Sequence, residues 1–153
     1  MASHLSVRTY IKSKFVLFTA VCTILLLLSS FYGLLSTKIL LIQLAAYFYN
    51  IGINTVIVVY FGTRSYKAID ISKKAAFNYQ GTGAAQWVYS LLIFLVPMVI
   101  YLPFKFMIGS TAGVVALGIA GLISFFLQDW WVDVLTREFF KRKYLILEGF
   151  RQK

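Results

Sequence analysis

Four polar side chains follow one another along a stretch of the sequence that is otherwise apolar. They are Gln43, Tyr47, Asn50 and Asn54, at spacings of four, three and four residues. This spacing puts them on one face of an α-helix. Amides and a phenol on such a face could line a path for a polar or amphiphilic substrate. Alternatively, they could hydrogen-bond to a neighbouring helix.

A second group of candidates lies in the connection 64–86, which reads RSYKAIDISKKAAFNYQGTGAAQ. Its Gly-Thr-Gly is not a phosphate-binding loop, because the GxxxxGK[ST] pattern is missing. The basic residues could hold anionic lipid headgroups, or the connection could dock a cytoplasmic partner. The candidate docking residues are Arg64, Lys67, Asp70, Lys73, Lys74, Asn78, Gln80, Gly81 and Gly83.

Small residues recur in the stretch 107–128, where one pair forms a GxxxG pattern and others repeat every four residues. Small side chains let helices approach closely where lipid provides no hydrophobic force between them. The pattern predicts helix packing, either within this chain or against another chain. The residues concerned are Gly109, Ala112, Gly113, Ala116, Ala120, Gly121 and Ser124.

Catalytic and metal-binding patterns are missing from the sequence. There is no HExxH motif, no paired carboxylates and no nucleophile with a nearby base, and the single histidine and single cysteine have no second ligand beside them. We therefore expect a protein that is not an enzyme and binds no metal or cofactor of its own. The predicted spans also hold no ionisable residue, which argues against a proton-coupled carrier acting alone.

The elements that position these residues are predicted to be membrane-spanning helices. The 153 residues are 60% hydrophobic and 13% charged, which excludes a soluble domain of this size. A helix needs about 20 apolar residues to cross a bilayer, and lysines and arginines mark the limits of such stretches. The predicted spans are about 15–36, 39–62, 86–104 and 107–128. Pro97 and Pro103 predict a kink or an early stop in the third span.

The basic residues indicate how these spans are oriented. Thirteen of the 15 Lys and Arg residues lie in the N-terminal tail, the connection 64–86 and the tail 129–153; the other two are Lys38 and Lys105. The positive-inside rule then places both termini in the cytoplasm. This clustering is not that of a nucleic-acid-binding face. Trp, Phe and basic residues in the tail 129–153 predict an amphipathic helix on the inner surface.

The fold prediction is thus an all-α integral membrane bundle with four transmembrane helices, N-in and C-in. A C-terminal interfacial amphipathic helix completes it. The chain 1–153 forms a single membrane unit, with membrane lipids as its surroundings.

Two strings in the sequence resemble a known family. FNYQGTGAAQW (77–87) and FFKRKYLILEGFRQK (139–153), with a span ending Pro97-Met-Val-Ile-Tyr101-Leu-Pro103 between them, resemble the C-terminal portion of longer multi-span membrane proteins from Bacteroidetes. That family has no known function and is similar to ABC exporter permease subunits. The resemblance covers about residues 40–153. It implies a place in the bacterial inner membrane and a separate cytoplasmic ATP-binding cassette subunit that hydrolyses ATP.

Three functions are compatible with these features. The first is a permease-like subunit of an ABC-type exporter that docks its ATPase through the loop 64–86. The second is a free-standing four-span carrier or flippase-like protein for lipid-linked substrates. The third is a non-transporting membrane assembly subunit, part of a homo- or hetero-oligomer, whose small residues pack against larger partners.

Overall fold

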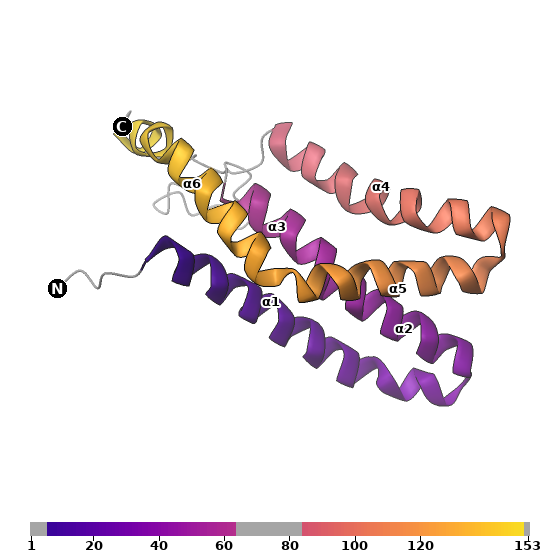
Figure 1. Ribbon diagram of the computed structural model, residues 1–153. Helices are drawn as coiled ribbons and strands as arrows, with labels where there is room; N and C mark the ends of the chain where they lie inside the picture. Colours follow the sequence, from indigo (N-terminus) through magenta and orange to yellow (C-terminus); the bar gives the residue numbers. More distant parts are fainter. Residues whose placement is uncertain (1–5, 64–83, 152–153) are drawn as a thin grey trace, which may run out of the picture.

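The computed structural model describes residues 6–63 and 84–151, with side chains over 6–63 and 88–141. These ranges are all helical and contain no strand, as the sequence predicts. Eight helical segments follow one another (Figure 1). They are α1 (Val7–Ser29), the 3-10 turn η1 (Ser30–Leu34), α2 (Thr37–Tyr49), the π-helical turn η2 (Asn50–Asn54), α3 (Thr55–Gly62), α4 (Ala84–Met107), α5 (Ser110–Phe126) and α6 (Gln128–Arg151).

Serine caps decide where the first two long helices begin. The Ser6 hydroxyl accepts a hydrogen bond from the Thr9 N–H at 3.2 Å, and the Ser36 hydroxyl accepts one from the Lys38 N–H at 3.3 Å. Such caps satisfy N–H groups that the first helical turn leaves unpaired. Helix α1 therefore begins well before the predicted limit at residue 15. The charges mark where the apolar part of α1 begins, whereas the cap marks where the helix itself begins.

The helix that holds the predicted third span ends a few residues later than the limit predicted from Lys105. Helix α4 continues through Pro97 and Pro103 as far as Met107, so the early stop does not occur. Each proline removes one backbone N–H donor from the helix, a loss that helices in apolar surroundings tolerate. The chain turns at Gly109, whose φ of 135° suits glycine, and the N–H of Gly109 bonds to the Phe104 carbonyl at 3.1 Å.

Several helices are long and apolar enough to cross a membrane. Among the described residues these are Val7–Leu34, Thr37–Gly62 and Val88–Met107. A fourth crossing would need α5 together with the Gln128–Lys141 part of α6, and these two helices meet at a bend of 66°. Apolar side chains cover the outer faces of α1 and α4; Phe94 on α4, for example, is 70% exposed. Such faces suit a lipid environment.

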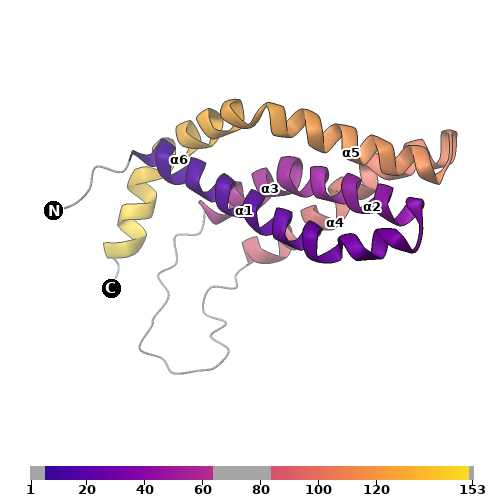
Figure 2. The same ribbon diagram turned by 90° about the horizontal axis from the view of Figure 1, so that it is seen from below.

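Several helix ends gather at one end of the bundle, together with the charged residues of α1 and α6. The start of α1, the end of α3, the start of α4 and α6 lie there, and the turns after η1 and after α4 lie at the opposite end (Figure 1). Figure 2 shows α5 passing over α2 and α3, with α6 continuing toward the start of α1. This arrangement is the one that four crossings with both termini on one side would require.

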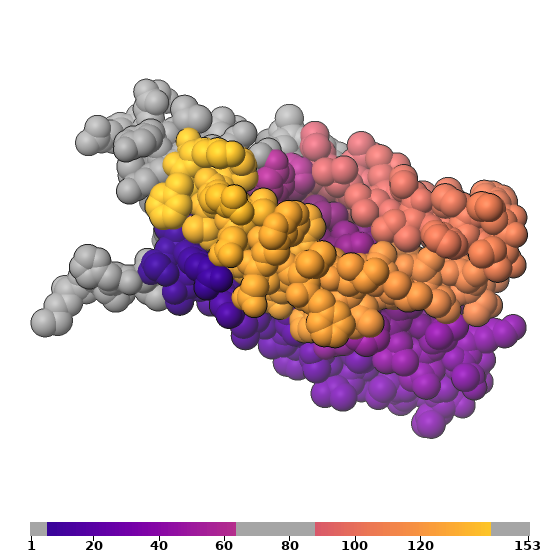
Figure 3. Space-filling model, in the orientation of Figure 1, coloured from indigo at the N-terminus to yellow at the C-terminus, as the bar shows by residue number. Residues whose placement is uncertain are grey.

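Helix α6 packs against protein at that end. Val132 and Leu135 of α6 form a cluster with Ile11, Phe15 and Val59, and each of the five is at most 4% exposed. Figure 3 shows α6 lying against the start of α1. The predicted helix exists, and α1 and α3 bury these two residues of its apolar side. Its place on a membrane surface stays a prediction.

Helix α5 crosses η2 with the two backbones in contact. A Cβ added to Gly52 would collide with the Gly121 carbonyl, and one added to Gly121 would collide with the backbone of Phe48 and Tyr49. Farther along the same crossing, a Cβ on Gly118 would lie 3.2 Å from the Ala45 Cα. Glycine at these positions is what allows the two hairpins, α1 to α3 and α4 to α5, to pack together.

The arrangement of the helix ends predicts the labelling of single cysteines by a membrane-impermeant maleimide. In a Cys22→Ser background, Leu35→Cys and Ser110→Cys should react in sealed right-side-out vesicles. Thr9→Cys and Gly62→Cys should react only after lysis, because they lie at the opposite, basic end of the bundle. Labelling of Gly62→Cys together with Leu35→Cys before lysis would contradict four crossings.

The crossing at Gly52 predicts a loss of stability in Gly52→Ala. The added methyl group meets backbone, which cannot rotate away, so the free energy of unfolding should fall by about 1–3 kcal/mol. Gly62→Ala is the matched control, because nothing lies within 4 Å of its added Cβ. Thermal unfolding in detergent measures both variants. Equal unfolding temperatures for the two variants would show that the backbones do not touch.

Candidate functional site

A π-helical turn interrupts the middle of the Thr37–Gly62 helix. At its end, the backbone N–H and the side-chain hydroxyl of Thr55 both bond to the carbonyl of Asn50, five residues earlier, with the hydroxyl at 2.8 Å. Thr55 is only 3% exposed. Single π turns within α-helices occur frequently at functional sites. The turn is therefore the first place to look for a binding site.

The first half of the predicted polar stripe, Gln43 and Tyr47, hydrogen-bonds to the neighbouring helix α1. Gln43 Nε2 donates to the backbone carbonyl of Ser29 at 2.7 Å, and the hydroxyls of Tyr47 and Thr23 lie 3.0 Å apart. Both partners belong to α1. These contacts favour the interhelical hydrogen-bonding interpretation for Gln43 and Tyr47.

The second half of the stripe lies in the π turn and bonds locally. Asn50 Nδ2 donates to the carbonyl of Ala46 at 2.9 Å, and Asn54 Nδ2 donates to Asn50 Oδ1 at 2.8 Å. Both side chains are half-buried. The turn therefore reaches the outside of the bundle, and neither asparagine contributes a described hydrogen bond to another helix.

Three buried polar atoms in this helix have no hydrogen-bond partner within the described part of the chain. They are Gln43 Oε1, the Tyr49 hydroxyl and Asn54 Oδ1. Tyr49 is 7% exposed and immediately precedes the π turn, whereas Asn54 ends it. A buried polar group without a partner costs about 1–3 kcal/mol. The sequence analysis missed Tyr49. Tyrosine is common in apolar helices, and position 49 does not share the three- and four-residue spacing that puts the stripe on one helix face.

The predicted packing residues divide into three groups. Gly113, Gly121 and Ser124 are buried, whereas Ala112, Ala116 and Ala120 are half-buried. Gly109 lies in the turn before α5 with nothing within 4 Å of its Cβ position, and its positive φ explains the glycine. It packs on no described residue of this chain, and packing against another chain stays a prediction.

The buried members of this ridge contact elements of the same chain. A Cβ on Gly113 would lie 2.6 Å from the Tyr101 ring of α4, and Gly121 meets α2. The Ser124 hydroxyl accepts a bond from Trp131 Nε1 at 3.1 Å, across the bend between α5 and α6. Gly118, which the spacing argument missed, also packs on α2.

The candidate docking residues lie outside the described residues. They are Arg64, Lys67, Asp70, Lys73, Lys74, Asn78, Gln80, Gly81 and Gly83. Their predicted role therefore stays a prediction.

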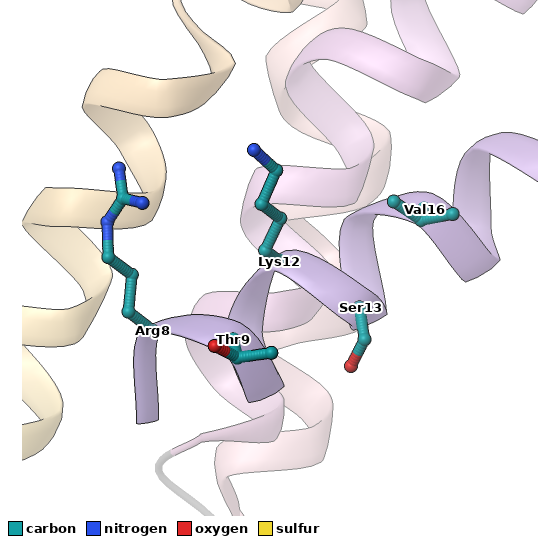
Figure 4. A pocket seen from close by; sticks show the side chains of 5 residues that line it. All are labelled: Arg8, Thr9, Lys12, Ser13 and Val16. Atoms are coloured by element: carbon teal, nitrogen blue, oxygen red, sulfur yellow. The ribbon is translucent and has the colours of Figure 1, made fainter. Parts of the chain in front are cut away.

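A recess of about 370 Å³ lies along the start of α1, lined by Arg8, Thr9, Lys12, Ser13 and Val16 (Figure 4). All its lining residues come from one helix. Two of them pair with carboxylates of α6: Arg8 Nε lies 2.8 Å from Asp133 Oδ1, and Lys12 Nζ lies 3.5 Å from Asp129 Oδ1. Exposed pairs of this kind contribute little stability. Arg8 and Lys12 thus take part in the contact between α1 and α6, and the recess carries no further candidate site.

Comparison of the sequence with known protein families gives one match. A family model matches all of residues 1–153. The chain belongs to DUF5687, a family of unknown function. No curated protein and no solved structure matches it. Because the DUF5687 description names no activity, a function for this chain has to be argued from its own residues.

Within this DUF5687 chain, the two neighbouring tyrosines of α2 predict different responses to the same substitution. Tyr47→Phe loses the bond to Thr23 and should lower the free energy of unfolding by about 0.6 kcal/mol, the membrane average. Tyr49→Phe removes a buried hydroxyl that has no partner among the described residues, so stability should stay the same or rise. Thermal unfolding in one detergent compares the pair. A larger loss for Tyr49→Phe would reveal a partner for its hydroxyl.

Proposed function

We propose that this chain is a membrane-spanning, permease-like subunit of an ABC-type exporter in the bacterial inner membrane. It crosses the bilayer four times, N-in and C-in, and docks a separate cytoplasmic ATPase through the loop 64–86. The observation that carries the proposal is the polar π turn in the middle of an apolar helix. Buried oxygens of this helix have no hydrogen-bond partner among the described residues. Transporters commonly hold their substrates near the bilayer midplane on interrupted helices.

The arrangement of the bundle supports the four crossings. The bent pair of α5 and α6 is apolar enough to serve as the fourth span. The described helix ends that flank the loop 64–86 lie at the same end as α6 (Figure 1). An ATPase bound to that loop would therefore lie close to α6, which is joined directly to α5.

The distribution of charge supports an external energy source. No Asp, Glu, Lys, Arg or His occurs between residues 39 and 63 or between residues 106 and 128, and the charged residues of the bent fourth span all follow residue 128, on α6 at the basic end of the bundle. A carrier driven by protons or voltage needs such groups within its spans. In an ATP-driven exporter the energy arrives mechanically through the partner subunit, so the spans need no titratable residue.

The two alternative functions differ in what supports them. A free-standing carrier for lipid-linked substrates would use the same polar turn and differ only in needing no ATPase. The assembly-subunit alternative was suggested by the small-residue ridge, but the buried glycines of that ridge contact α2 and α4 of this chain. The structure therefore offers no specific observation in favour of that alternative.

Purification of the tagged full chain with its partner tests the exporter assignment. Extracted in mild detergent, the wild type should retain a protein with a Walker A motif and ATPase activity. Lys73→Glu/Lys74→Glu should lose most of both, because it reverses two charges in the docking loop.

Lys38→Glu/Lys105→Glu is the matched control, since it makes the same charge change at the opposite end of the bundle. Equal recovery of the ATPase with both double variants would place its contact elsewhere. Recovery of no ATPase from any form would overturn the exporter assignment, and ATP-independent transport by the purified chain would then favour the free-standing carrier.

A further inference from the structure

The hydrogen bonds of the π turn run in a fixed direction. The Ala46 carbonyl can only accept, so Asn50 has to present its amide nitrogen to it. Asn50 Oδ1 is then an acceptor, and Asn54 has to present its own nitrogen there. The atom left over at the end of this chain is Asn54 Oδ1, which can only accept a hydrogen bond.

A second buried polar atom without a partner in the described part of the chain belongs to Tyr49, at the other end of the turn. Tyr49 immediately precedes the turn, is 7% exposed, and its hydroxyl can donate or accept. Gln43 Oε1 is the third of these unpaired atoms, but along the helix axis Gln43 lies about 16 Å from Asn54, at about 1.5 Å per residue, and outside the turn. The turn itself therefore offers one acceptor and one hydroxyl.

We propose that this turn binds the O–H or N–H group of a neutral or cationic amphiphile. An amide oxygen without a partner attracts a donor or a positive charge. An anionic carboxylate or phosphate would place its own acceptor oxygens against Asn54 Oδ1, which is also an acceptor. No basic residue between residues 39 and 63 could balance its charge. The ligand is amphiphilic because the helix around the turn is apolar and reaches the outside of the bundle at Asn50 and Asn54. Identifying this ligand as the exported substrate rests on the proposed function.

Binding is measured on the purified full chain alone, in nanodiscs of phosphatidylcholine, whose headgroup has no N–H or O–H donor. Tritiated dodecanol and dodecylamine are the probes, and binding to empty nanodiscs is subtracted. Both should bind saturably and displace each other. Dodecyltrimethylammonium, a cation without a donor, and dodecanoate, an anion, should compete at least threefold more weakly, as the loss of one hydrogen bond predicts.

Two variants locate the site. Asn54→Leu should weaken dodecanol binding about three- to tenfold, whereas Gln128→Leu, which removes an amide at the bend after α5, should leave it unchanged. If Asn54→Leu fails to fold, a photoreactive dodecanol on the wild type serves instead. It should label a peptide that contains residues 50–62.

Three outcomes would overturn the proposal. They are equal competition by all four amphiphiles, unchanged binding in a folded Asn54→Leu, and photolabelling confined to other helices. If dodecanol does not bind and Asn54→Leu is merely more stable than the wild type, the oxygen holds no more than water. Selective binding without any ATPase partner would overturn only the exporter assignment, and an ATPase partner without selective binding would overturn only this site.

Discussion

The contact between the backbones of η2 and α5 is the constraint on which the rest of the structure depends. In lipid, helices gain little from burying apolar surface against each other, so they associate where their atoms approach most closely. Gly52 and Gly121 provide that approach, with Gly118 extending it toward Ala45. The π turn lies at this crossing: its Gly52 faces α5, whereas Asn50 and Asn54 lie toward the outside of the bundle.

A second contact fixes the basic end of the bundle. Val132 and Leu135 of α6 fill the space between α1 and α3, and the Trp131 side chain bonds back to Ser124 across the bend. Helix α6 is thus held to its neighbours by packing, with only exposed ion pairs at the rim. Gly121 lies in α5, shortly before this bend. Helices α5 and α6 therefore connect the crossing beside the polar turn to the basic end of the bundle.

Hydropathy and charge were sufficient to predict the all-helical fold and the approximate long apolar helices. They did not predict the helix ends, which depend on single residues. The Ser6 cap lets α1 begin before its apolar part, and α4 continues past Lys105 until the chain turns at Gly109, which has a positive φ. The stripe was predicted, but its division into α1 contacts and a local turn was not. That division depends on the π turn. Within the turn, Gly52 packs directly against the backbone of Gly121, a residue that is distant in the sequence. Glycine spacing alone therefore could not distinguish Gly109 from Gly118.

The polarity of the turn originates in the helix backbone. The carbonyl of Ala46 orients Asn50, Asn50 orients Asn54, and an acceptor is left at the end, in a stretch 39–63 that holds no Asp, Glu, Lys, Arg or His. A charged site at this depth would cost several kcal/mol and would need a counter-ion. An amide chain avoids that cost and still discriminates between donors and anions. Because such a site has no proton to exchange, it can select a ligand but cannot drive its movement, and this is why the proposed function assigns the energy to a separate subunit.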